Sequence, residues 1–78
     1  QTAEEKARIQ SLVKIYEGMK AKDAARIFNT LDVDVLMRVM SRMSERKSAP
    51  ILAEMDPERA RTVTVLLAQQ TQLPGMSP

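Results

Sequence analysis

Residues 31–67 read LDVDVLMRVMSRMSERKSAPILAEMDPERARTVTVLL, a stretch in which a large apolar residue stands at every twelfth position. The series also extends toward the N-terminus and comprises Met19, Leu31, Met43, Met55 and Leu67. A fixed period of this kind is the signature of a repeat protein, in which each unit packs against its neighbours. We therefore predict four repeats, at residues 20–31, 32–43, 44–55 and 56–69, within one domain at residues 1–69.

Each repeat carries the same apolar pattern at positions i, i+3, i+4 and i+7, which is one face of an α-helix. The four sets are Ala24-Ile27-Phe28-Leu31, Leu36-Val39-Met40-Met43, Ser48-Ile51-Leu52-Met55 and Ala60-Val63-Thr64-Leu67. Isolated helices shorter than about 12–15 residues are marginal in water, so these units must share a core. The pattern therefore predicts an all-α, short-helix superhelical solenoid, with one longer N-terminal helix and four helices of about 10 residues.

Residues at the repeat boundaries explain why the helix restarts there. Good N-cap residues stand at three of them, namely Asp32, Ser44 and Asp56. Asp56 is followed by Pro57 and Glu58, which is typical of a helix start because proline has no N–H to lose at the first position. The first repeat has Lys20 at the cap position, but Gly18 is a suitable end for the helix before it.

The longer N-terminal helix is predicted at residues 2–17, where Thr2 and Glu5 have the spacing of a capping box. Its apolar face comprises Ile9, Leu12, Val13 and Tyr16. Four apolar residues also fit the a/d seam of a coiled coil, namely Ile9, Leu12, Tyr16 and Met19. The chain begins with Gln1 rather than Met, so we expect a longer protein in which this seam continues upstream and allows a homodimer.

Two local signals oppose the repeat pattern. Pro50 lies inside the third repeat and cannot donate a helical hydrogen bond, which predicts a kink or a late helix start near Ser48. Residues 62–65 alternate and are β-branched like a strand. We favour a helix there for two reasons. An isolated strand would have no partner strand, and the helical apolar pattern of the repeat continues through these residues in the same register. Residues 70–78 are predicted to form a disordered tail.

The composition argues against catalysis and metal binding. There is no His and no Cys among the 78 residues, which removes the commonest proton shuttle, the thiolate nucleophile and the usual transition-metal ligands. Neighbouring acidic residues stand where helices are predicted to start, and capping explains them there. We therefore predict that the chain is not an enzyme, has no catalytic or metal-binding residues, and uses no cofactor.

Charge and hydropathy exclude two further classes. The chain has 12 Lys and Arg residues against 10 Asp and Glu, a net charge of +2, with the two signs interspersed. A nucleic-acid-binding protein would cluster its basic residues and, for single strands, add aromatic stacking platforms. Only Tyr16 and Phe28 are aromatic, and no apolar run is long enough to span a bilayer. We predict neither nucleic-acid binding nor direct membrane insertion of this segment.

Two segments carry a resemblance to a known family, residues 16–28 (YEGMKAKDAARIF) and residues 49–60 (APILAEMDPERA). They resemble the helical repeats of the MgtE N-terminal domain family, and the likeness extends over roughly residues 13–67. Within this range, the sequence most resembles the C-terminal domain of MotE-type flagellar motility proteins of alphaproteobacteria. That resemblance implies a periplasmic chaperone that binds and stabilises the motility protein MotC. The alternative is a cytoplasmic, magnesium-sensing regulatory domain of an MgtE-type transporter.

Departures from the repeat indicate candidate partner-binding residues. They are Met37, Val65, Leu66, Arg38 and Arg42. Met37, Val65 and Leu66 add apolar side chains beside the core face, where other repeats have small or polar residues. Packing against the N-terminal helix or the tail would explain them equally well. Arg38 and Arg42 continue to Arg46 in steps of four, a spacing that favours a basic ridge for an acidic partner or simply a solvated face.

Overall fold

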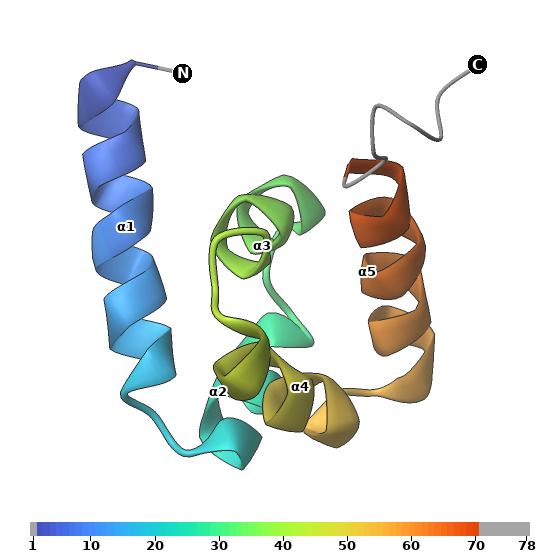
Figure 1. Ribbon diagram of the computed structural model, residues 1–78. Helices are drawn as coiled ribbons and strands as arrows, with labels where there is room; N and C mark the ends of the chain where they lie inside the picture. Colours follow the sequence, from blue (N-terminus) through green and yellow to red (C-terminus); the bar gives the residue numbers. More distant parts are fainter. Residues whose placement is uncertain (1, 71–78) are drawn as a thin grey trace.

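The computed structural model describes residues 2–70, which form five α-helices and no strand (Figure 1). The helices are α1 (Ala3–Glu17), α2 (Ala21–Phe28), α3 (Val33–Met40), α4 (Glu45–Glu54) and α5 (Pro57–Gln70). The predicted all-α class is therefore confirmed. The four repeat helices are less uniform than predicted, because α2 and α3 have 8 residues, α4 has 10 and α5 has 14.

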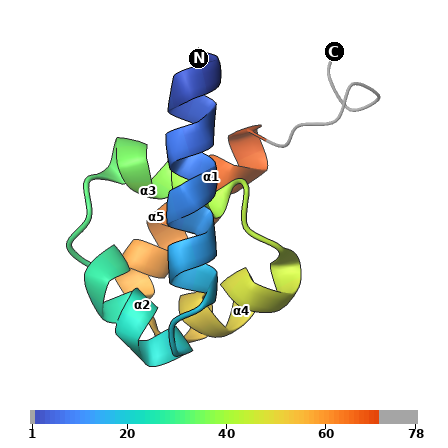
Figure 2. The same cartoon turned by 90° about the vertical axis from the view of Figure 1, so that its left-hand side faces the viewer.

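The first three helices each pack against the helix two units further along the chain. Contacts join α1 to α3, α2 to α4 and α3 to α5. In Figure 1 the odd-numbered helices stand side by side, while α2 and α4 lie together below them, and Figure 2 shows α2 and α4 on either side of α1. Two rows of short helices thus alternate along the chain, which is the arrangement expected of a superhelical solenoid.

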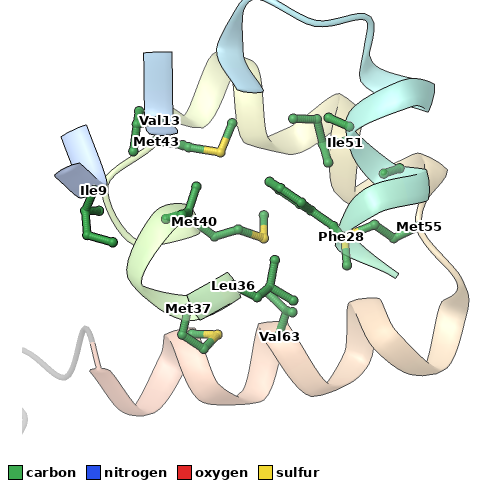
Figure 3. Close-up of a cluster of buried hydrophobic side chains, with 13 residues drawn as sticks. Ile9, Val13, Phe28, Leu36, Met37, Met40, Met43, Ile51, Met55 and Val63 are labelled. Atoms are coloured by element: carbon green, nitrogen blue, oxygen red, sulfur yellow. The ribbon is translucent and has the colours of Figure 1, made fainter. Parts of the chain in front are cut away.

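The rows share one hydrophobic core, which Figure 3 shows in close-up. Its largest fully buried side chains are Phe28, Leu36, Ile51, Val39 and Val63. Phe28 meets Tyr16, its counterpart one repeat earlier, edge to face with ring centroids 4.8 Å apart. Aromatic pairs of this geometry stabilise a core by about 0.5–1.5 kcal/mol beyond the area they bury. The repeat period therefore brings equivalent positions of successive units into contact.

In α3, α4 and α5, one flank faces the helix two units earlier, and we call this flank, and the equivalent flank of α1 and α2, the trailing flank. It contains Val39 of α3, Ile51 of α4 and Val63 of α5, all of which are buried. The equivalent residues of the first two helices are Ile15 of α1, which is 54% exposed, and Ile27 of α2, which is 37% exposed. The difference arises because, in the described part of the chain, α1 and α2 have no helix two units before them to pack on.

The opposite, leading flank faces the helix two units later and shows the reverse gradient. Val13 of α1, Ala25 of α2 and Met37 of α3 are buried, whereas Ala49 of α4 and Arg61 of α5 are exposed. Figure 3 shows the Met37 side chain lying against α5. Small residues such as Ala25 let the backbones of α2 and α4 approach closely, and the polar Arg61 suits a flank with no following helix among residues 2–70.

Two positions predicted for the core lie at the surface instead. Ile27 is exposed because it stands on the uncovered trailing flank of α2. Thr64 is exposed on α5, where its hydroxyl donates a hydrogen bond to the carbonyl of Ala60 at 2.8 Å. The i, i+3, i+4, i+7 pattern locates the face of each helix correctly but does not distinguish an internal repeat from a terminal one.

The predicted a/d seam on α1 packs partly within the domain itself. Ile9 is buried in the domain's own core, and Leu12, Tyr16 and Met19 pack against that core. Ile9 is thus fully used within the domain, whereas the other three side chains are only partly buried, and the upstream coiled coil stays a prediction.

The helices start next to the predicted cap residues, but not every one of these residues makes a capping hydrogen bond. Thr2 and Glu5 form the capping box, with Glu5 accepting from the Thr2 N–H at 2.8 Å, and this bond lowers the pKa of the Glu5 carboxyl. Asp32 accepts from the Asp34 N–H at 3.1 Å. Ser44 precedes α4 but makes no side-chain cap bond, and Lys20 makes none before α2.

Neither Pro50 nor the β-branched residues 62–65 interrupt a helix. α4 begins at Glu45, so the late start near Ser48 is wrong, and Pro50 is accommodated inside the helix at an exposed position. Residues 62–65 are helical within α5, where Thr62 and Thr64 donate to carbonyls four residues earlier. Gln70 belongs to α5 rather than to the predicted tail, and residues 71–78 lie outside the described residues.

Gly18 ends α1 with φ −84° and ψ −8°, a right-handed conformation that every L-residue adopts. A Cβ placed there would meet only the carbonyls of Ile15 and Lys14, each at 3.5 Å, which is ordinary contact. We expect Gly18→Ala to raise the free energy of unfolding by about 0.4–1 kcal/mol, because alanine restricts the unfolded chain. Urea denaturation followed by circular dichroism measures this, and a loss of stability would contradict it.

Candidate protein-interaction surface

The three apolar residues predicted from the sequence to bind a partner differ in how exposed they are. Met37 is only 4% exposed and packs in the core, so its assignment to a partner surface is wrong. Val65 is 51% exposed on α5, whereas the adjacent Leu66 is half-buried and packs against the core. Of the three, Val65 alone presents a largely free apolar side chain.

The basic ridge does not lie on one helix face. Arg38 belongs to α3, Arg42 lies in the turn after it, and Arg46 belongs to the first turn of α4. All three are exposed, but the turn between α3 and α4 breaks the spacing of four that would align them on a continuous helix. The prediction of an i, i+4 ridge is therefore wrong, although each arginine remains at the surface.

Sequence reasoning missed two further exposed apolar residues, Ile15 and Ile27. Both stand on the trailing flank, in the register that is buried in α3, α4 and α5. The available signal was their position in the first two helices of the repeat, which have no earlier partner in the described chain.

Two hydrogen bonds tie the turns of the solenoid together at equivalent places. Glu17, at the end of α1, accepts from the backbone N–H of Ser44 at 2.9 Å. Asn29, after α2, accepts from the backbone N–H of Asp56 at 2.9 Å. Each bond spans 27 residues, and the second is the first moved along the chain by one repeat. Both fix the start of a helix to the end of the helix three units earlier.

A hollow lies beside each of these bonds. The first junction, between the end of α1, the start of α2 and α4, has a volume of about 230 Å³. It is lined by Tyr16, Glu17, Met19, Ala21, Arg46, Lys47, Pro50 and Ile51. The second junction, between the end of α2 and the start of α5, has a volume of about 310 Å³ and is lined by Asn29, Asp56, Glu58, Arg59 and Thr62. The first has an apolar floor and the second is mostly polar.

The Asn29 bond is expected to contribute to stability. We predict that Asn29→Ala lowers the free energy of unfolding by about 0.5–1.5 kcal/mol, the usual effect of losing one hydrogen bond. The matched control is Ser41→Ala one repeat later, since the Ser41 hydroxyl donates only to the Arg38 carbonyl of its own helix. We expect the control to change the free energy by less than about 0.5 kcal/mol. Equal effects in urea titrations of the two variants would contradict the prediction.

Within residues 2–70, no three His, Cys, Asp or Glu side chains are grouped to hold a metal ion. None of the helices in this range has the length and apolar character needed to cross a bilayer.

Comparison with known proteins places this architecture in a family. The family model described as the MgtE intracellular N domain matches residues 4–71, which is most of the chain. No curated protein and no solved structure matches it. The matched range contains all the repeats, both junctions and nearly all of α1. The chain therefore belongs to the MgtE intracellular N domain family.

Proposed function

We propose that this chain is a non-catalytic protein-interaction domain of a flagellar motility protein, and that it acts as a periplasmic chaperone for a MotC-like partner. The observation that carries the proposal is the exposure of large apolar side chains on a domain whose core is otherwise complete. These are Ile15, Ile27 and Val65. Each of them offers exposed apolar surface that a protein partner could cover.

The binding surface that we propose includes Val65 and Leu66 on α5, together with the exposed Arg38 and Arg42 on and after α3. α3 and α5 pack against each other, so these residues belong to neighbouring elements. Arginine is one of the residue types enriched at protein interfaces, together with aromatic residues and Met. The resemblance of residues 16–28 and 49–60 to MotE-type proteins supports the choice of partner.

Deleting the coding sequence for residues 1–78 from the chromosomal gene tests this function. We expect a lower amount of the MotC-like protein in the periplasmic fraction and a loss of swimming, because the partner would no longer be stabilised. Re-expression of the domain in the periplasm should restore both. Unchanged partner levels and unchanged swimming after the deletion would exclude the proposed role.

The family description favours a second candidate, a cytoplasmic regulatory domain of an MgtE-type magnesium transporter. A magnesium-sensing domain binds Mg²⁺ in its folded state, and a ligand of the folded state raises the melting temperature. Thermal denaturation in MgCl₂, compared with NaCl of equal ionic strength, separates the two. The chaperone proposal expects no difference between the salts, and a specific rise in Tm with Mg²⁺ would favour the transporter domain.

A further inference from the structure

The two junctions are the same part of the fold, used twice. Four lining residues of the first junction have counterparts, twelve positions later, that line the second. Glu17 corresponds to Asn29, Arg46 to Glu58, Lys47 to Arg59 and Pro50 to Thr62. The matching bonds from Glu17 and Asn29 to backbone N–H groups confirm the equivalence. Differences between the junctions therefore reflect their side chains rather than their place in the fold.

An arginine bridges the two helices of the second junction. Arg59 reaches from α5 to the end of α2, where its Nε donates to the carbonyl of Phe28 at 3.1 Å. Its Nη2 atom is buried and has no hydrogen-bond partner within residues 2–70. The chain thus supplies its own side chain to bridge the two helices at this junction.

The first junction lacks this internal bridge. Lys47, the counterpart of Arg59, is exposed, and the Tyr16 carbonyl accepts instead from the N–H of Met19 at 3.1 Å. The floor of the hollow is apolar, because Tyr16, Met19 and Ile51 contribute to it. Pro50 replaces the Thr62 of the second junction and adds further apolar surface. The hollow between α1 and α4 is therefore an apolar recess, whereas the hollow of the second junction is mostly polar.

The rim of the recess is positively charged. Arg46 and Lys47 are both exposed, and neither takes part in an ion pair within residues 2–70. Both stand in the first turn of α4, where they outnumber Glu45, and the N-terminus of the helix adds positive potential. Ser44 makes no side-chain cap bond there. The carboxylate of Glu17 is nearby but already accepts the N–H of Ser44. This combination favours an anionic group beside the recess.

We propose that the first junction is the anchor site for a protein partner, which inserts one apolar side chain between α1 and α4 and places a carboxylate beside Arg46 and Lys47. The hollow of about 230 Å³ is smaller than the roughly 300–1,000 Å³ of typical small-molecule sites, which favours a side chain over a cofactor. Charge complementarity identifies the acidic neighbour. The inference rests on the proposed protein-binding function and names the chemistry of the segment that is bound.

Titration of the ¹⁵N-labelled chain with a short peptide, in which one leucine is followed by two glutamates, tests the site directly. We expect amide shifts to concentrate at the end of α1 and the first turn of α4. Replacing the leucine by alanine, or the glutamates by lysines, should weaken binding by about tenfold, a loss of about 1.4 kcal/mol. Shifts centred on other helices, equal binding of the three peptides, or no binding would overturn the proposal.

Charge-reversed variants of the chain supply the matched comparison. We expect Arg46→Glu with Lys47→Glu to weaken peptide binding by about tenfold. Arg61→Glu, an equally exposed position on α5, should leave it unchanged. Unaltered circular dichroism would show that both variants fold. Equal peptide affinity for the two variants would overturn the anchor site.

The same variants separate this inference from the proposed function. If the peptide binds at the junction but the MotC-like partner does not bind the chain, the anchor site is supported and the proposed partner is wrong. If the partner binds the wild type and the Arg46/Lys47 variant equally, the proposed function is supported and the anchor site is overturned.

Discussion

Phe28→Ala is expected to unfold most of the protein at physiological temperature. Phe28 is fully buried at the centre of the core, where it contacts Tyr16 edge to face. Truncation of a buried phenylalanine costs about 3–5 kcal/mol, through lost transfer free energy and the cavity that remains. A core of this size rarely supplies more than about 3–5 kcal/mol in total. The mutation therefore removes most of the stability that the domain has.

Thermal denaturation followed by circular dichroism at 222 nm measures this effect. The matched control is Ile15→Ala, which shortens a side chain that is largely exposed and is expected to change the free energy of unfolding by less than about 0.5 kcal/mol. A cooperative transition for Phe28→Ala close to that of the wild type would show that the Phe28 ring is not central to the core.

Val39→Asp is expected to have an effect of similar size for a different reason. Val39 is fully buried on the trailing flank of α3, and an aspartate there would have no charge partner in the core. An uncompensated charge in such a position destabilises a protein by about 3–5 kcal/mol. We expect little helical signal at 37 °C and partial recovery at low pH, where the carboxyl is protonated.

The informative comparison for Val39→Asp is Ile27→Asp, which introduces an aspartate at the equivalent position one repeat earlier in the chain. Ile27 occupies the same register but is 37% exposed, because α2 has no helix two units earlier within residues 2–70, so we expect its cost to stay below about 1 kcal/mol. Urea denaturation of both variants under one set of conditions gives the difference. Equal destabilisation would contradict the arrangement in which each helix packs on the helix two units later.

Much of the fold follows from local sequence. The period of twelve residues, the cap residues and the apolar face of each helix depend on neighbouring positions, and they predicted the all-α class. The repeat also predicted correctly that residues 62–65 are helical, against their β-branched alternation. Pro50 misled the prediction of the α4 start, because its missing hydrogen bond is tolerated inside the helix.

The site was much less predictable. Met37 departs from Ala49 and Arg61 because α3 has a later helix to pack on, whereas α4 and α5 have none within residues 2–70. Whether a flank is covered depends on whether another helix lies two units before or after it. The apolar pattern within one helix does not indicate this. The junctions depend on contacts between residues 27 to 31 positions apart, such as Arg59 with Phe28. Side chains that meet across such distances cannot be paired from spacing alone.

Isothermal titration of the purified domain with the purified MotC-like motility protein tests most directly whether this fold is a protein-interaction domain of the proposed kind. We expect saturable binding with a defined stoichiometry and a Kd of about 10⁻⁶ M or lower, a binding free energy of about −8 kcal/mol or more favourable. If no saturable heat of binding to the folded partner is measured at concentrations well above that Kd, the proposed function is contradicted.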